Sequence, residues 1–142
     1  MKLVKHLLEN KGNQIWSIEP DRSVLDAIKM MAEKGIGALL VMEGHHLTGI
    51  VSERDYARKV ILQGRSSDKT EVREIMTDKV FSTGPDNSVE ECMTVMTRKR
   101  IRHLPVVEGN SVIGVLSIGD LVKAKIEEQE HQIEQLQNYI TT

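Results

Sequence analysis

Apolar residues recur along the chain with two spacings, which predict helices alternating with strands. Over 24–32 they fall at i, i+3, i+4, i+7 and i+8, the spacing of one helix face. Ser23 precedes this run as an N-cap candidate, and Gly35 follows it at the position where helices commonly end. Two short apolar stretches, 38–42 and 47–52, then flank a Gly-containing connection that suits a hairpin.

The same order returns 65 residues later. Residues 15–60 align with 80–125 without a gap, and 15 of the 46 aligned positions are identical. Average composition would give about three identities by chance. Further back, the segment Val4-Lys-His-Leu-Leu resembles Val72-Arg-Glu-Ile-Met at an offset of 68. The chain therefore contains two copies of one unit of about 60 residues.

Each copy predicts the order β-α-β-β-α, starting from the apolar stretches 15–18 and 80–83. The fold class is therefore α+β or mixed α/β. Each copy is too small to cover its own sheet, so we expect the two to pack sheet to sheet with pseudo-twofold symmetry and two related clefts. The expected boundaries are 1–64 for the first copy with an N-terminal helix, 65–71 for a polar linker, 72–125 for the second copy and 126–142 for a C-terminal helix.

The C-terminal segment predicts a helix that seeks a partner. Ile126, Ile133 and Ile140 are seven residues apart, and charged or Gln residues fill the other faces. The helix either packs on the N-terminal helix around Val4 and Leu7-Leu8 or forms a seam between two chains. We favour a homodimer contact.

Composition narrows the function classes. The chain has 19 Lys plus Arg against 21 Asp plus Glu and only 3% aromatic residues, which argues against a nucleic-acid surface. The single cysteine, Cys92, excludes an internal disulfide and a multi-Cys zinc site, and its place on an apolar helix face predicts a core residue. No HExxH, GxSxG or P-loop motif is present, so we expect no enzyme and no metal. The longest apolar run, 38–42, is far too short to span a membrane, and we expect a cytoplasmic protein.

The motif that says most about function is Ser-x-x-Asp, placed where a predicted strand passes into a predicted helix. It occurs at Ser52 and Asp55 and again at Ser117 and Asp120. A Ser hydroxyl and free N–H groups at a helix N-terminus can receive an anion. An ionised Asp only accepts hydrogen bonds, which suits a ribose diol. The alternative is a capping box in both copies, and the two interpretations are compatible.

Arg102 and His103 directly precede the strand expected beside Asp120, where they could bind phosphate. The alternative is a solvated helix end, where cations favour the helix dipole. The first copy has Gly37 and Ala38 at these positions, without charge, so we expect the two sites to differ in ligand or affinity.

Taken in order, the motifs resemble a tandem pair of cystathionine-β-synthase (CBS) domains over residues 1–125. The resemblance is carried by Ser17-x-x-Pro20-Asp21-x-Ser23-Val24, by Leu104-Pro105-Val106-Val107 and by both Gly-x-x-Ser-x-x-Asp stretches. It implies two nucleotide clefts, in which each Asp holds ribose hydroxyls and each Ser holds phosphate. One departure is Leu40, which stands where the second copy has Pro105.

The resemblance also implies two sets of ligand residues. The Asp120 site would comprise Ser117, Arg102, His103, Leu104 and Pro105, completed by Ser17 and Ile18 from the other copy. The Asp55 site would comprise Ser52, Gly37 and Ala38, completed by Ser82 and Thr83, with Arg54 and Arg58 as the source of charge.

We therefore expect an adenine-nucleotide-binding regulatory module that makes or breaks no bond. AMP or NAD(H) is the first choice of ligand, with ADP and ATP as further candidates, and the regulated partner is unknown. The alternatives are a ligand-free assembly or dimerisation module and, more weakly, a nucleic-acid-binding protein that uses the basic segment 98–103.

Overall fold

The chain folds as two compact units. The computed structural model describes residues 2–12 and 14–141. One unit is Ile15–Phe81, called here the contiguous unit, and the other joins Met1–Gln14 to Ser82–Thr142, called here the composite unit. Both combine helices with small sheets, so the mixed α/β class is confirmed.

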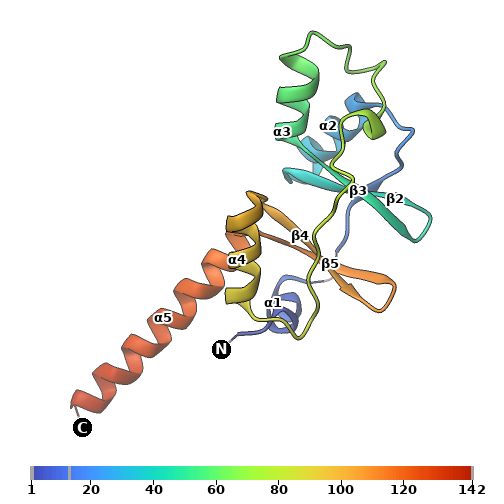
Figure 1. The fold of residues 1–142 in the computed structure, drawn as a ribbon. Coiled ribbons are helices and arrows are strands. Elements are labelled where there is room, and N and C mark those ends of the chain that lie inside the picture. Colours follow the sequence, from blue (N-terminus) through green and yellow to red (C-terminus); the bar gives the residue numbers. More distant parts are fainter. Residues whose placement is uncertain (1, 13, 142) are drawn as a thin grey trace. The chain divides into compact units, whose positions relative to one another are not determined.

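The contiguous unit is built around a three-stranded sheet (Figure 1). The strands are β1 (Ser17–Ile18), β2 (Ala38–Glu43) and β3 (His46–Ser52), with β1 parallel and β3 antiparallel to β2. The helices are α2 (Val24–Lys34) and α3 (Glu53–Tyr56), and α3 runs on as a π-helical turn, Ala57–Ile61. A 3₁₀ turn, Val72–Glu74, comes next along the chain.

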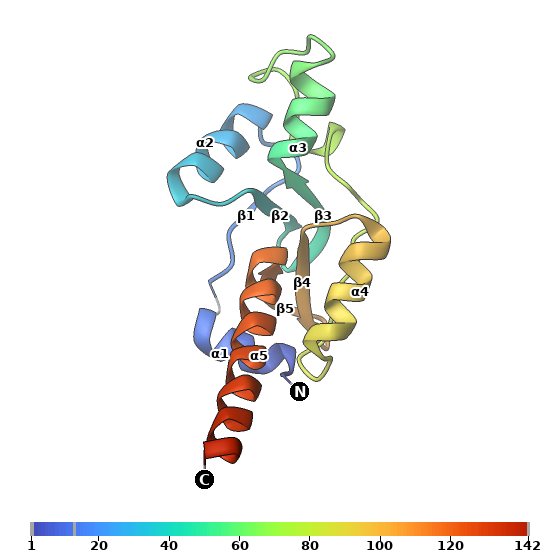
Figure 2. The same ribbon diagram turned by 90° about the vertical axis from the view of Figure 1, so that its left-hand side faces the viewer.

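The composite unit repeats this plan around the antiparallel pair β4 (His103–Glu108) and β5 (Ser111–Ser117). Its helices are α1 (Val4–Lys11), α4 (Val89–Lys99) and α5 (Ile118–Thr141), and α4 contacts α5 (Figure 2). Thr83 takes the place of β1 and makes a single parallel bridge to Val106.

The helix ends follow the sequence signals. Ser23 accepts a hydrogen bond from the Asp26 N–H at 3.1 Å, and Ser88 accepts one from the Glu91 N–H at 3.1 Å. Gly35 ends α2 in the left-handed conformation, as expected of a residue without a Cβ. The residue at the matching position after α4 is Arg100, which adopts the same conformation with φ 55°.

Each unit has its own apolar core. In the composite unit, α1 supplies Val4, Leu7 and Leu8 to a cluster with α4, β4, β5 and the first turns of α5. Cys92 belongs to this cluster and is buried, as expected, and burial raises the pKa of its thiol. The contiguous core contains Val72 and Ile75 from the 3₁₀ turn and the residue after it.

Segments 2–8 and 70–76, called here the two lead-ins, are exchanged between the copies. The Val4 N–H donates to Asn87 O at 2.9 Å, and the Val72 N–H donates to Arg22 O at the same distance. One residue on, Lys5 N–H bonds Pro85 O and Arg73 N–H bonds Pro20 O, each at 3.0 Å. The lead-in of the first copy thus packs on the body of the second, and the lead-in of the second copy packs on the body of the first.

This exchange gives the units bounds that differ from the repeat boundaries 1–64 and 72–125 expected from sequence. Helix α1 belongs to the composite unit, because its apolar side fills the core of that unit. The stretch 65–71 is hydrogen-bonded within the contiguous unit, where the Leu25 N–H donates to Ser67 O at 2.9 Å. No break separates 126–141 from the second copy, because α5 is continuous from Ile118 to Thr141, and residue 142 lies outside the described residues.

Two glycines allow the lead-ins to pack directly on the strands. A Cβ at Gly114 of β5 would lie 2.6 Å from Leu8 Cδ2. A Cβ at Gly49 of β3 would lie 2.7 Å from Met76 Sδ and 2.8 Å from Thr77 O. These approaches are closer than carbon contacts allow, so each glycine is required by its neighbour rather than by its own backbone angles.

Candidate functional site

The corner between β5 and α5 holds the Asp120 carboxylate through local hydrogen bonds. The Ser117 N–H donates to Asp120 Oδ2 at 2.8 Å, and the Asp120 N–H donates to Ser117 Oγ at 3.2 Å. This reciprocal pair is a capping box, as one of the two sequence interpretations proposed. It fixes the carboxylate in the first turn of a 24-residue helix.

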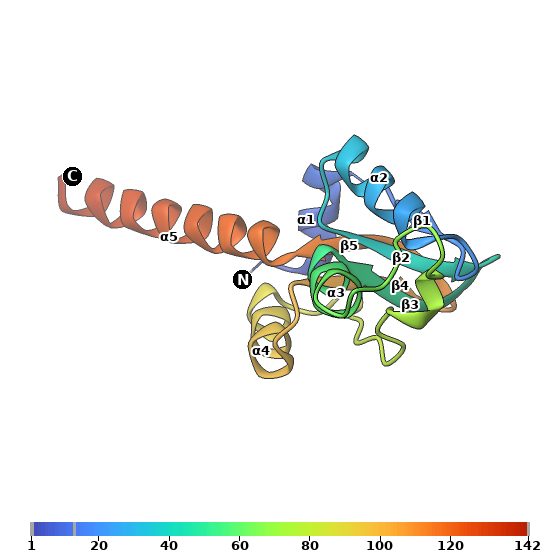
Figure 3. The ribbon, with the colours of Figure 1, turned by 90° about the horizontal axis from the view of Figure 1, so that it is seen from above.

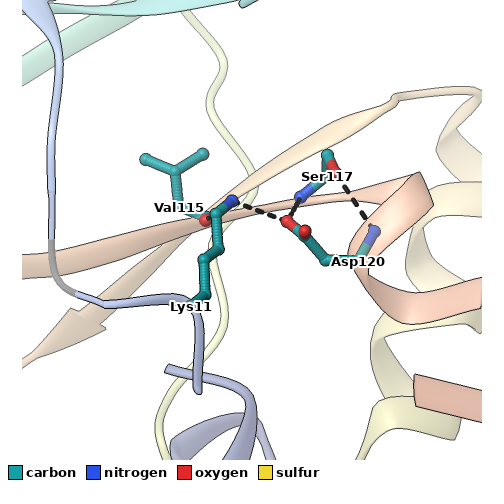
Figure 4. Close-up of polar contacts among 4 residues, drawn as sticks. All are labelled: Lys11, Val115, Ser117 and Asp120. Carbon is teal, nitrogen blue, oxygen red and sulfur yellow. Dashed lines mark hydrogen bonds and ion pairs between the residues drawn. The ribbon is translucent and has the colours of Figure 1, made fainter. Parts of the chain in front are cut away.

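A lysine from α1 completes this corner (Figure 4). Lys11 Nζ lies 2.6 Å from Asp120 Oδ2 and 2.7 Å from Val115 O. The Ser117 N–H and Lys11 Nζ both bond Oδ2, and neither of them uses Oδ1. Sequence reasoning missed Lys11, because the repeat that aligns the two lead-ins ends at Leu8 and nothing local relates residues 11 and 120.

These contacts set the charge of the corner. Burial alone would raise the pKa of Asp120, but the hydrogen bonds from Lys11 and from the Ser117 N–H outweigh it, and the pKa lies below its usual value. His103 is half-buried, and burial together with the positive charge of Lys11 lowers its pKa. At neutral pH the Asp120 carboxyl is therefore ionised and the His103 imidazole is neutral.

Strand β4, which pairs with β5, begins beside this corner, and two further predicted residues lie at or just before its start. His103 lies opposite Ser117 in the β4–β5 ladder, and the Ile118 N–H donates to Arg102 O at 2.8 Å. The Arg102 side chain is exposed. The residues at and just before the start of β4 thus lie beside Ser117 and Ile118, two to three positions before Asp120.

The Ser52 corner has the same backbone plan but a more enclosed carboxylate. Asp55 Oδ2 accepts from the Ser52 N–H at 2.9 Å and from the Ser52 hydroxyl at 3.0 Å, and Lys59 Nζ lies 3.6 Å from Oδ1. The Asp55 side chain is 16% exposed, against 29% for Asp120. Both Asp55 oxygens thus already contact groups of their own unit, which distinguishes this corner from the one at Asp120.

Four further residues expected at the Ser52 corner lie in its unit. Glu53 N–H donates to Gly37 O at 3.0 Å, and Ala38 lies opposite Ser52 in the β2–β3 ladder. Arg54 and Arg58 are exposed on the helical segment that follows Ser52.

Some of the predicted site residues also contribute to the interior of their units. The side chains of Ile18 and Leu104 belong to the core clusters of their units, and Pro105 is buried. Thr83 accepts hydrogen bonds from Asn87 Nδ2 at 2.8 Å and from the Cys92 thiol at 3.3 Å. Ser17 and Ser82 are exposed. Ser17 and Ile18 belong to the unit of Asp55, and Ser82 and Thr83 to the unit of Asp120.

The fold and the two corners match one family. The CBS domain family model matches residues 12–61 and 72–127, which is most of the chain. The chain therefore belongs to the CBS domain family, as its resemblance implied, and it is a CBS domain pair of the regulatory class.

Individual relatives agree with this assignment. The CBS domain-containing protein CBSX3, mitochondrial, of Arabidopsis thaliana is 42% identical over 134 residues, which are 91% of this chain and 65% of that protein. The chain thus spans about two thirds of that relative. A structure of a candidate signal-transduction protein with CBS domains from Burkholderia ambifaria is 53% identical, with a TM-score of 0.87, covering 90% of this chain and 96% of that one.

One similar structure contains ligands. The CBS domain pair of protein MJ0100 was solved in complex with 5′-methylthioadenosine and S-adenosyl-L-methionine. It is 25% identical with a TM-score of 0.79, covering 90% of this chain and 98% of that one.

Within residues 2–12 and 14–141, no helix combines the length and apolar character that a membrane span requires.

Proposed function

We propose that this chain is a sensor of adenine nucleotides, with AMP or NAD(H) as ligand, and that its principal site is the corner at Asp120. Support comes from membership of the CBS family and from the adenosine compounds bound to the CBS pair of MJ0100. The observation that carries the proposal is the Asp120 carboxylate, which is ionised, held in place through Oδ2 and only partly buried.

In this proposal the groups of the corner have separate roles. Asp120 accepts hydrogen bonds from ribose hydroxyls, which an ionised carboxylate does well. Arg102 supplies a permanent positive charge for phosphate, and Ser117 supplies a hydroxyl. His103 is neutral at pH 7, so it contributes a hydrogen bond rather than a charge to the ligand.

The proposed site at Asp55 is weaker. Its carboxylate is more enclosed, and Lys59 lies beside Asp55 Oδ1. At Asp120, by contrast, neither Ser117 nor Lys11 uses Oδ1. A ligand there would have to displace contacts that the unit already makes. We therefore expect Asp120 to be occupied at lower ligand concentrations than Asp55.

The proposed mechanism is a shift between conformations, without any bond made or broken. A ligand that binds one conformation better than another raises the population of the first, and a coupling of about 1–3 kcal/mol is enough for regulation. The regulated partner is not identified. We place this activity in the cytoplasm, whereas the Arabidopsis relative CBSX3 is named as a mitochondrial protein.

Titration calorimetry with AMP and with NADH tests the proposal. Asp120→Ala should lower the affinity at least about tenfold, because hydrogen bonds to a charged group contribute about 1.5–3 kcal/mol each. Asp55→Ala is the matched control and should change the affinity of the tighter site less. Unchanged affinity in Asp120→Ala would refute the site, and no binding by the unmodified chain would refute the function.

A second candidate function is assembly, favoured by one observation on α5. Only the first turns of this helix join the core, and its C-terminal part extends beyond β4 and β5 (Figure 3). Ile126, Ile133 and Ile140 are 49%, 55% and 79% exposed. A thermal-shift titration separates the candidates, because only a nucleotide binder gains stability as the ligand concentration rises above its dissociation constant.

A further inference from the structure

The ammonium group of Lys11 has donor capacity that the contacts within the unit do not use. A lysine carries three N–H donors, and Lys11 directs one to Asp120 Oδ2 and one to Val115 O. The third donor remains. The side chain is 39% exposed and that of Asp120 is 29% exposed, so both are accessible to a ligand.

The position of Lys11 is fixed by more than the ion pair. Helix α1 is anchored by Val4, Leu7 and Leu8 in the composite core, one to two turns before Lys11. The bond to Val115 O ties the same ammonium group to the strand that leads into the corner. Lys11 therefore reaches Asp120 from a helix that is itself held in the unit, at little further cost in side-chain freedom.

Together the two side chains present one unused donor beside one carboxylate oxygen that neither Lys11 nor Ser117 uses. A hydroxyl group both donates and accepts, so it satisfies such a pair with a single oxygen. A ribose diol supplies two hydroxyls on neighbouring carbons. A carboxylate alone can only accept from them, whereas the pair also donates to them.

We propose that Lys11 is a ligand-binding residue of the Asp120 site, donating to the ribose hydroxyl whose proton Asp120 accepts. This inference rests on the proposed function and extends it to a residue of α1. It makes Lys11 a determinant of selectivity for ribose over deoxyribose. It also links α1 directly to the state of the site.

The test compares two ligands and three chains by titration calorimetry. The ligands are AMP and 2′,3′-dideoxy-AMP, and the chains are the unmodified protein, Lys11→Met and Lys5→Met. Lys5 is the matched control, because it lies on the same helix and pairs at 3.2 Å with Asp86, whose side chain is 83% exposed. Lys11→Met should weaken AMP binding about tenfold and dideoxy-AMP binding less than about twofold, because only AMP carries the hydroxyls. Lys5→Met should change neither.

Three results would overturn the inference while leaving the nucleotide function intact. Equal losses for both ligands would mean that Lys11 contacts another part of the nucleotide or only maintains the fold. Unchanged AMP affinity would mean that Lys11 does not contact the ligand. Tighter AMP binding in Lys11→Met would mean that Lys11 competes with ribose for Asp120. Failure of the unmodified chain to bind AMP would instead refute the AMP proposal itself, and with it this inference.

Discussion

At the scale of single residues, Asp120 shows how neighbours fix the charge of a functional group. Burial opposes its ionisation, and Lys11 and the Ser117 N–H favour it more strongly. The folded protein therefore binds a proton at this carboxyl less readily than the unfolded chain does. By linkage, ionised Asp120 stabilises the fold above the pKa of the unfolded chain, and this contribution is lost as the pH falls through the lower pKa of the folded state.

We therefore expect Asp120→Asn to lower the free energy of unfolding at pH 7, by about 1 kcal/mol for a partly exposed pair. The difference from the unmodified chain should shrink as the pH falls from about 4, where the unfolded chain begins to bind the proton, through the lower pKa of the folded state. Urea denaturation at pH 7 and pH 3 measures both quantities. Asp86→Asn, which affects the exposed pair with Lys5, should have little effect at either pH. A difference that does not depend on pH would contradict the assigned role of the charge.

The residues of this corner differ in how far the sequence predicts them. Ser117 and Asp120 are three positions apart, so their mutual hydrogen bonds follow from local helix-capping rules. Arg102 and His103 follow from the register of a hairpin whose turn is visible in the sequence. Lys11 reaches Asp120 across 109 positions, and only the packing of α1 brings it there, so no local pattern reveals it.

At the scale of elements, both hairpins and the main helices follow the periodicity of the sequence, but the first strand of the second copy does not. The stretch 80–83 was expected to form a strand and makes only the bridge at Thr83. Proline explains the difference. In the contiguous unit, Leu40 N–H donates to Trp16 O at 3.2 Å, and the residue that matches Leu40 is Pro105, which has no N–H to donate to Phe81.

The two glycines under the lead-ins should respond unequally to a methyl group. Gly49→Ala brings a Cβ to 2.8 Å from Thr77 O, which accepts a hydrogen bond from the Ile50 N–H, while the Thr77 N–H donates to Ile50 O. The backbone at Thr77 is therefore held in place, and the substitution should cost about 1–3 kcal/mol of stability. Gly114→Ala meets Leu8 Cδ2 first, and the end of a leucine side chain can move aside, so the loss should be smaller.

Urea denaturation of the alanine variants checks this order. Gly119→Ala is the control, because a Cβ there lies 3.6 Å from Ser117 Oγ, an ordinary contact, and alanine favours a helix over glycine by about 1 kcal/mol. It should leave stability unchanged or raise it. A larger loss at Gly114 than at Gly49 would show that Leu8 is held more rigidly than the backbone at Thr77.

At the scale of the whole molecule, the exposed part of α5 predicts association of two chains. Isoleucines seven residues apart form a seam that a second copy of the same helix can match, residue for residue. Ile133→Glu should shift the chain from dimer to monomer in sedimentation experiments, because it places a charge in the seam. Gln135→Glu adds the same charge on another face and should leave the dimer intact. A protein that is monomeric before any substitution would remove the basis for the assembly function.

The exchanged lead-ins also predict how the chain responds to a cut. Lys69 is exposed, and cleavage after it would leave 1–69 and 70–142. The first piece carries α1 of the composite unit and the body of the contiguous one, and the second carries the remaining parts of both. The cleaved protein should therefore elute from a sizing column as one species and separate only in denaturant. Separation without denaturant would mean that the lead-ins contribute little to either core.

The same exchange makes each copy of the repeat depend on the other for a complete core. Either half expressed alone would lack the lead-in that completes its apolar core. Its own lead-in would lack the copy on which it packs. The two halves thus resemble a domain-swapped dimer whose two chains have been joined into one polypeptide. Loss, separate expression or degradation of one half would therefore affect the other.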